Sequence, residues 1–442
     1  MNYLNYFKKV FKNTDLLKKI LYILFILLIF RIIAHVPIPG PSPAALKEFF
    51  NKAFSSGNSI LPFFDVFSGG STSRFSIGLM SLGPYITASI MIQLLTMVSP
   101  KLEQMSKDSE ESRQKLNQYT RYITVPLCFI EGFGMIMLLE NISKQAGVNL
   151  LANVGILGWF IMLLSITAGT VFLMWLGELI TEKGLGNGIS IIIFAGILAR
   201  LPQFVGQSIS KIFGGAQIDN QALMTFGEVS GRAVVMILLN VLITEAKRKV
   251  PISYAKRVRG AKLYGGVDTH LPLRLNMTGV IPIIFAGAFM NIPQVIGFLS
   301  NAKTAWIKNA ADFIKTTFAS TTPEYAIFYF LMVFSFTFFS TFLYFKPKDV
   351  AENIQKQGGF IPGIRPGTQT EKYLTFLIMR VTLWGAIFLS FIAVFPFAMQ
   401  IFTNAQNFAI GGTSILIVVA VAIEIINQLK AQIITRSYEE IV

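Results

Sequence analysis

The stretch that decides the fold is residues 152–178, which read ANVGILGWFIMLLSITAGTVFLMWLGE. These residues carry no charge before Glu178. A helix needs about 20 mostly apolar residues to cross about 30 Å of hydrocarbon, and this stretch is long enough to do so. It therefore predicts a membrane-spanning helix.

Nine other stretches have the same character, so the chain is predicted to cross a membrane ten times. The ten predicted spans are residues 20–36, 75–98, 120–139, 152–178, 189–206, 222–245, 277–299, 324–345, 373–400 and 408–428. The second, fifth and seventh contain or adjoin Gly and Pro residues. Such helix breakers survive at membrane depth only where protein or a water-filled cavity satisfies the freed backbone groups. These three spans are therefore candidates to line an interior feature.

The composition of the whole chain excludes an ordinary soluble protein. Of 442 residues, 53% are hydrophobic and 14% are charged, whereas soluble domains are about 45–50% apolar and about 25% charged. The first 36 residues have the basic start and apolar run of a cleavable signal. However, Arg31 interrupts the run and no small-residue cleavage site follows, so we expect a retained first span.

The net charge of +15 is better explained by membrane topology than by nucleic-acid binding. With the amino terminus inside, the inner segments carry 26 Lys and Arg residues and the outer segments carry 10. Basic residues collect in cytoplasmic loops, so this ratio predicts that both termini are cytoplasmic.

Two cytoplasmic loops, 246–276 and 346–372, are longer than a topology signal requires. The first carries Arg248, Lys256, Arg257 and Arg259, and the second carries Arg365 in a Gly- and Pro-rich run. Long ordered loops often carry function. We therefore favour docking of an acidic partner, either ribosomal RNA through its phosphates or a protein with an acidic patch.

The residues point to no catalytic constellation. His35 and His270 are far apart in sequence, and Cys128 is the one cysteine, so neither a zinc site nor a disulfide is expected. Glu131 is the one ionisable residue near the middle of a span, where a lone carboxylate is more often structural than a proton relay. The glycine-rich run 184–188 joins two spans and predicts a tight turn, not a phosphate loop. We expect neither enzymatic activity nor a cofactor.

Isoleucines recur at helical spacing in two of the interrupted spans. Ile86 and Ile90 share one helix face, as do Ile189 and Ile193. Periodicity alone favours the simple interpretation, in which they face lipid or core. Two other classes of protein are less well supported. A secondary transporter with broken helices would need charged residues at the midplane, and an intramembrane enzyme would need a nucleophile with its base or metal ligands.

Several stretches taken together resemble the SecY family of protein-conducting translocon channels. They are Pro37–Gly40, Asp65–Gly70, Gly83–Ile90 with Gln93–Leu95, Thr181–Ser190, Leu271–Asn276, Gly279–Pro282, Gly359–Gly367 and Gly411–Ser414. The resemblance runs in order from the first span to the last. It implies ten helices in two inverted five-helix halves around a central pore, residues 1–206 and 207–442, with a hinge near 205–222.

The resemblance also assigns roles to residues within the membrane. It implies a pore ring of Ile86, Ile90, Ile189, Ile193, Ile284 and Ile417. A narrow apolar constriction of this kind dewets and blocks ions. The segment 61–73 resembles the family's plug, a short helix that caps the closed pore from outside, with Leu61, Asp65, Val66, Phe67, Ser68, Gly69 and Gly70. The implied lateral gate includes Thr87, Gln93, Asn276 and Thr278.

The resemblance implies partners and a location as well. The two basic loops would bind the SecA motor ATPase or the ribosome through Arg248, Lys256, Arg257, Arg259 and Arg365. Small SecE and SecG subunits, signal-sequence-bearing polypeptides and membrane lipid complete the implied partners. The expected function is a passive channel in the bacterial cell membrane that translocates unfolded polypeptides and releases membrane segments sideways.

Overall fold

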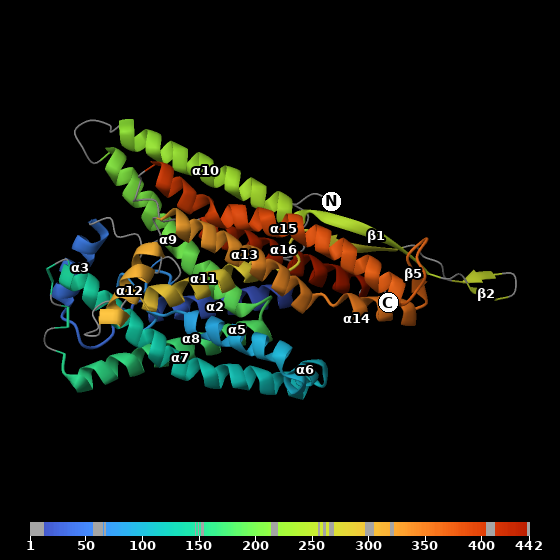
Figure 1. The fold of residues 1–442 in the computed structure, drawn as a ribbon, viewed down its shortest axis with the longest axis horizontal. Coiled ribbons are helices and arrows are strands. Elements are labelled where there is room, and N and C mark those ends of the chain that lie inside the picture. Colours follow the sequence, from blue (N-terminus) through green and yellow to red (C-terminus); the bar gives the residue numbers. More distant parts are fainter. Residues whose placement is uncertain are drawn as a thin grey trace.

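The computed structural model is a bundle of long helices with a small sheet at one end (Figure 1). It describes residues 13–55, 65, 68–145, 147–148, 150–151, 154–213, 220–254, 257–259, 262–264, 269–296, 305–318, 322–403 and 412–439. Strands β1 (Lys247–Tyr254), β2 (Arg257–Arg259) and β5 (Gly359–Phe360) extend from one end of the bundle, and helices α3 (Pro43–Ser55) and α12 (Ala305–Thr317) lie at the other.

Each of the ten predicted spans corresponds to a helix. In chain order these are α2 (Thr14–Ile33), α5 (Gly83–Val98), α7 (Glu110–Gln145), α8 (Ile156–Lys183), α9 (Gly188–Phe213), α10 (Asn220–Glu245), α11 (Ile281–Ile296), α13 (Pro323–Tyr344), α15 (Thr368–Thr403) and α16 (Gly412–Glu439). Six of the described helices are long and apolar enough to cross a membrane, and they correspond to α7, α8, α10, α13, α15 and α16. The apolar parts of α5 and α9 are shorter. The chain is a polytopic membrane protein of the predicted all-α class, apart from the small sheets formed by its loops.

The second span begins later than the sequence predicts. Residues 75–82 form turns, and α5 starts at Gly83 with Pro84 in its first turn. Phe75 and Ser81 each have φ of 48°, a left-handed conformation that a right-handed helix cannot contain. Proline is favoured in the first turn of a helix because its missing N–H would have no partner there. The apolar composition of 75–82 therefore overstated the length of the helix.

The helices pack mostly against neighbours from the same part of the chain. Helices α2 and α9 pack on α8, α5 packs on α7, and α7 packs on α8; in the second part α11 and α15 pack on α13, and α10 and α15 pack on α16. Contacts of α5 with α11 and of α9 with α16 and α10 join the two parts. Much of the segment 205–222, which was expected to contain a hinge, is helical, because α9 continues through Gly206 to Phe213 and α10 starts at Asn220; residues 214–219 lie outside the described chain.

The turn between α8 and α9 has the tight form that its glycines predict. Gly186 has φ of 80°, and the Gly188 N–H donates to the Thr181 hydroxyl at 2.9 Å. A Cβ atom on Gly188 would lie only 1.9 Å from the Gly177 carbonyl oxygen, so the two helices approach backbone to backbone here. This close approach fixes α9 against α8.

The two basic loops form one small sheet. Strand β1 pairs antiparallel with β4 (Thr269–Arg274), and its Ser253 and Tyr254 pair with β5 from the second loop. Strand β2 pairs separately with β3 (Lys262–Tyr264) as a hairpin beyond this sheet. Apolar residues of β1 and β4 pack on α14 (Pro347–Lys356) and α15. The sequence did not predict these strands or α14, which lie within segments expected only to be long loops.

Gly169 offers a test of the close packing of α8. A Cβ atom at this position would lie 2.1 Å from the Ile77 carbonyl oxygen, which is backbone and has little freedom to move. We expect Gly169→Ala to lower the free energy of unfolding by about 1–3 kcal/mol, the usual effect of overpacking. Thermal unfolding in detergent measures this as a lower Tm.

Gly227→Ala is the matched control, since this helical glycine has no atom within 4 Å of the Cβ position. There the added methyl lowers the backbone entropy of the unfolded chain and should raise the free energy of unfolding by about 0.5–1 kcal/mol. Equal shifts in Tm for the two variants would contradict the described packing.

Candidate functional site

The isoleucines assigned to the ring gather around one apolar cluster, the largest in the described chain. Ile193 and Ile417 are buried within this cluster, and Ile86, Ile189 and Ile284 are half-buried and pack against it. They come from α5, α9, α11 and α16, so the cluster joins both parts of the chain. Ile90 is also buried, at 2% exposure, but it lies outside the cluster. The ring itself stays a prediction.

One face of α9 carries both isoleucines and two further residues that bind the plug segment. Ile189, Ile193, Gly196 and Arg200 are spaced by four, three and four residues, which places them along one stripe of the helix. At about 1.5 Å of rise per residue, Gly196 lies about 4.5 Å beyond Ile193 and Arg200 about 10 Å beyond it. The plug segment is therefore placed next to the isoleucines, on the side away from the sheet.

Gly69 of the plug segment contacts this stripe through its backbone. A Cβ atom on Gly69 would lie 3.0 Å from the Gly196 Cα and 3.1 Å from the Phe30 ring, so no side chain fits without movement. Gly69 also has φ of 66°, which glycine adopts at no steric cost. Two independent constraints thus require glycine at position 69.

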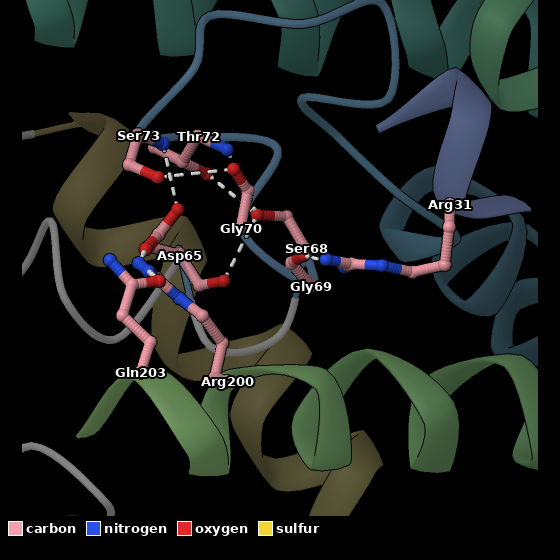
Figure 2. A network of polar contacts seen from close by, with 9 residues as sticks. All are labelled: Arg31, Asp65, Ser68, Gly69, Gly70, Thr72, Ser73, Arg200 and Gln203. Atoms are coloured by element: carbon pink, nitrogen blue, oxygen red, sulfur yellow. Dashed lines mark hydrogen bonds and ion pairs between the residues drawn. The ribbon is translucent and has the colours of Figure 1, made fainter. Parts of the chain in front are cut away.

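Polar contacts hold the same segment to two helices (Figure 2). The Asp65 side chain is completely buried and forms an ion pair with Arg200 of α9. Its other carboxylate oxygen accepts from the Ser73 N–H at 2.7 Å. Arg31 of α2 donates to the Gly69 carbonyl oxygen at 2.8 Å. Of the predicted plug residues, Leu61, Val66 and Phe67 lie outside the described part of the chain.

Among the described residues of the predicted plug, Asp65 is helical and residues 68–73 form turns and a bend. Gly69 and Gly70 are both at positive φ. The Ser68 hydroxyl pairs with the Thr72 hydroxyl at 2.9 Å and accepts from the Thr72 N–H at 3.1 Å. Helical geometry within 68–75 is therefore absent, because two adjacent left-handed residues end any right-handed helix.

Of the predicted gate residues, Thr87 and Gln93 lie on α5, which contacts α11, and Asn276 and Thr278 lie in the bends that precede α11. Gln93 of α5 donates to Ser89 at 3.3 Å and interacts with the hydroxyl of Tyr344, the last residue of α13. Asn276 donates to the Gly279 carbonyl oxygen at 3.1 Å. Thr87 bonds within its own helix, to the Gly83 carbonyl oxygen at 3.2 Å.

Three side-chain oxygens of the predicted gate residues are buried and have no hydrogen-bond partner among the described residues. They are the side-chain oxygens Gln93 Oε1, Asn276 Oδ1 and Thr278 Oγ1. Such atoms cost free energy in the closed arrangement, since each has lost its bonds to water without replacement. Near the same boundary, Lys346 of the second part pairs with Glu103 of α6 (Pro100–Lys107) at 3.4 Å. This ion pair joins the two parts of the chain at this end.

The predicted docking residues lie on or beside the sheet. Arg248 is exposed on β1, Arg257 and Arg259 lie on β2, and Lys256 lies outside the described residues. Arg365 is exposed in a turn between Gly363 and Gly367, both of which have positive φ. Ile361 and Ile364 fix this turn by packing into the cluster under the sheet. The strand pairing brings the two predicted docking loops together.

Sequence reasoning missed the roles of Arg31, Arg200 and Gly196. In the sequence, neither Arg200 nor Gly196 stands out, and Arg31 is notable only as the residue that interrupts the first apolar run. The available signal was the seven-residue spacing from Ile193 to Arg200, which places a charge on the same helix face as the isoleucines. Tyr344 carried no such signal, because its contact with Gln93 joins distant parts of the chain.

A sequence model of the SecY family matches residues 76–426 of this chain. The chain belongs to the SecY family. The SecY protein translocase subunit of Thermotoga maritima is 40% identical over 436 residues, which cover 98% of this chain and 96% of that protein. The corresponding subunit of Streptomyces coelicolor is 39% identical over 442 residues, with 98% of each chain covered.

Solved structures of the SecY and Sec61 channels have the same fold. A structure described as a protein conducting channel superposes with a TM-score of 0.58 at 17% identity, over 93% of this chain and 91% of that one. A SecY structure described by its plug domain, which is said to stabilise the closed state of that channel and to maintain a membrane seal, also gives 0.58, at 18% identity over the same shares of the two chains. At these identities the likeness concerns the fold alone.

Thr278 allows the free-energy cost of an unpaired buried hydroxyl at the predicted gate to be measured. Thr278→Val removes the unpaired buried hydroxyl while keeping the shape of the side chain, so we expect Tm to rise, by the equivalent of about 1 kcal/mol or more. Thr337→Val is the matched control, because that buried hydroxyl donates to the Val333 carbonyl oxygen at 2.7 Å and its loss should not stabilise. A lower Tm for Thr278→Val than for Thr337→Val would contradict this account of the gate.

Proposed function

We propose that this chain is the protein-conducting channel of a Sec translocon, which passes unfolded secretory polypeptides across the membrane and releases transmembrane segments sideways into the bilayer. One observation carries the proposal. The isoleucines of α5, α9, α11 and α16 meet at one apolar cluster, and the plug segment is bound directly beside them on α9. An apolar constriction excludes water and ions when closed, and it binds no particular peptide sequence tightly.

The ring is proposed to consist of Ile86, Ile90, Ile189, Ile193, Ile284 and Ile417. β-Branched side chains are stiff at χ1, so such a ring keeps its shape when empty. Because the cluster joins the two parts of the chain, a small separation of these parts opens a path through it. Residues 1–206 and 207–442 would be the two moving halves.

The lateral gate is proposed at the contact of α5 with α11 and α13. Thr87 and Gln93 come from α5, Asn276 and Thr278 directly precede α11, which α5 contacts, and three of the four have unpaired buried oxygens. Weak polar contacts in place of close apolar packing lower the cost of parting these helices. A hydrophobic signal sequence can then compete with the closed arrangement and pass through the opening into lipid.

The chain is proposed to be passive and to take its energy from a partner at the sheet. SecA or the ribosome would bind through Arg248, Lys256, Arg257, Arg259 and Arg365, with SecE and SecG as further subunits. The pairing of β1 with β5 supports one shared docking surface for both basic loops. This surface is cytoplasmic, as are both termini, in the bacterial inner membrane, consistent with the excess of basic residues on that side.

Crosslinking of a stalled precursor tests the pore directly. Cys128 is first replaced by Ser, and single cysteines are then introduced at the six ring positions. Each should crosslink to a cysteine in a secretory polypeptide arrested in transit, because the chain must pass within contact distance of the ring. A cysteine at Leu164, which is 51% exposed on the outside of α8, serves as the control. Crosslinks at Leu164 as strong as those at the ring would refute the proposed pore.

Arg365→Glu tests the docking surface. Reversal of a charge at a polar interface weakens binding by several kcal/mol, so we expect motor-driven export to fall by about tenfold or more. Lys348→Glu in the same loop is the control, since Lys348 is exposed on α14, away from the Arg365 turn. Export rates in membrane vesicles that contain equal amounts of each variant give the comparison. Equal losses in both variants would argue against a specific role for Arg365.

A further inference from the structure

Two arginines from different helices bind the described plug residues. Arg200 of α9 forms the ion pair with Asp65, and Arg31 of α2 holds the Gly69 carbonyl oxygen at 2.8 Å (Figure 2). Arg200 also donates to Gln203 on its own helix at 2.6 Å, which orients the guanidinium toward the plug. The Asp65 side chain is 0% exposed and the Arg200 side chain is 17% exposed, so the pair is largely out of water.

A third arginine makes this region strongly positive. A Cβ atom on Gly70 would lie 3.5 Å from the Arg74 guanidinium and 3.7 Å from the Arg200 side chain, so both flank the plug turn. The positive charge of Arg74 repels that of Arg31, and the positive charge of Arg31 repels that of Arg200. Among the described residues, Asp65 is the carboxylate that forms an ion pair with this group. The negative charge of Asp65 therefore binds Arg200 and also offsets the repulsion among the three arginines.

The plug contacts and the gate contacts lie in different places. The plug is bound to α2 and α9, which both belong to the first part of the chain. The gate contacts, in contrast, join α5 to α11 and Glu103 to Lys346, across the two parts. Separation of the two parts would break the gate contacts and leave the described plug contacts intact.

We propose that the Asp65–Arg200 ion pair is a latch that holds the plug shut independently of the lateral gate, so that ion conduction through the resting pore is controlled by this pair and not by the contacts of the gate. This inference rests on the function proposed above. Loss of one partner of a buried ion pair is far more costly than loss of both, because it leaves an uncompensated charge. If this ion pair is the latch, a variant that removes one partner should therefore leak more than the variant that removes both.

The experiment measures the resting ion conductance of the purified, reconstituted complex in planar bilayers without substrate. Asp65→Asn leaves Arg200 unpaired beside Arg31, and should raise the open fraction by about tenfold or more, as expected for a broken buried pair. Adding Arg200→Gln to Asp65→Asn should lower that leak again, because the unpaired charge is removed. Arg200→Lys, which keeps the charge, should leak less than Arg200→Gln.

Two controls separate the latch from other causes of leak. Glu48→Gln breaks an exposed ion pair with Lys52 in α3 and should not change the conductance. Glu103→Gln weakens the contact across the gate and should likewise leave resting conductance unchanged. The latch is refuted if Asp65→Asn leaks no more than Glu48→Gln, if the double variant leaks more than Asp65→Asn, or if Glu103→Gln leaks as much as Asp65→Asn.

Translocation of a secretory precursor by the same reconstituted wild-type complex is measured in parallel. Failure of the wild type to translocate with its partners present would refute the proposed function, whatever the conductances show. Normal translocation together with unchanged leak in Asp65→Asn would refute the latch alone. Normal translocation with the predicted order of leaks supports both.

Discussion

The position of the predicted plug depends on the backbone of Gly69 lying against the backbone of Gly196. Any side chain at position 69 would push the plug segment away from α9 and from the isoleucines one turn below. The ion pair of Asp65 with Arg200 and the bond from Arg31 act on the same segment, so their geometry depends on that contact. In the proposed function, this contact holds the seal where the bilayer supplies no water to satisfy polar groups.

In the proposed function, the apolar cluster and the predicted gate meet different requirements of a channel. The cluster blocks ions, and the gate lowers the cost of opening. The cluster around Ile193 and Ile417 is apolar and buried, and in the proposed function it is the barrier to ions. The boundary at Gln93, Asn276 and Thr278 instead keeps unpaired buried oxygens, which raise the free energy of the closed state. In the proposed function, the cluster would block ions while the two parts separate at a modest cost along the predicted gate.

The sequence predicted the membrane class and the ten helices, because span length and apolar composition are local properties. It overstated the second span, since Phe75 and Ser81 adopt a left-handed conformation that composition does not register. It also treated 246–276 and 346–372 as loops, although β1 pairs with β5 from a segment about one hundred residues away. The pairing of Asp65 with Arg200 was likewise invisible, because only tertiary structure brings these residues together. The ring and gate assignments came from the family resemblance and not from periodicity.

Water accessibility along the isoleucine face of α9 tests the central claim most directly. In a Cys128→Ser background, single cysteines at positions 193 and 164 are exposed to a small, charged, membrane-impermeant thiol reagent, with the channel at rest or holding an arrested precursor. A dry seal predicts that position 193 reacts only with the precursor in place and that position 164, on the outside of α8, reacts in neither state. Rapid reaction at position 193 in the resting channel would contradict the account.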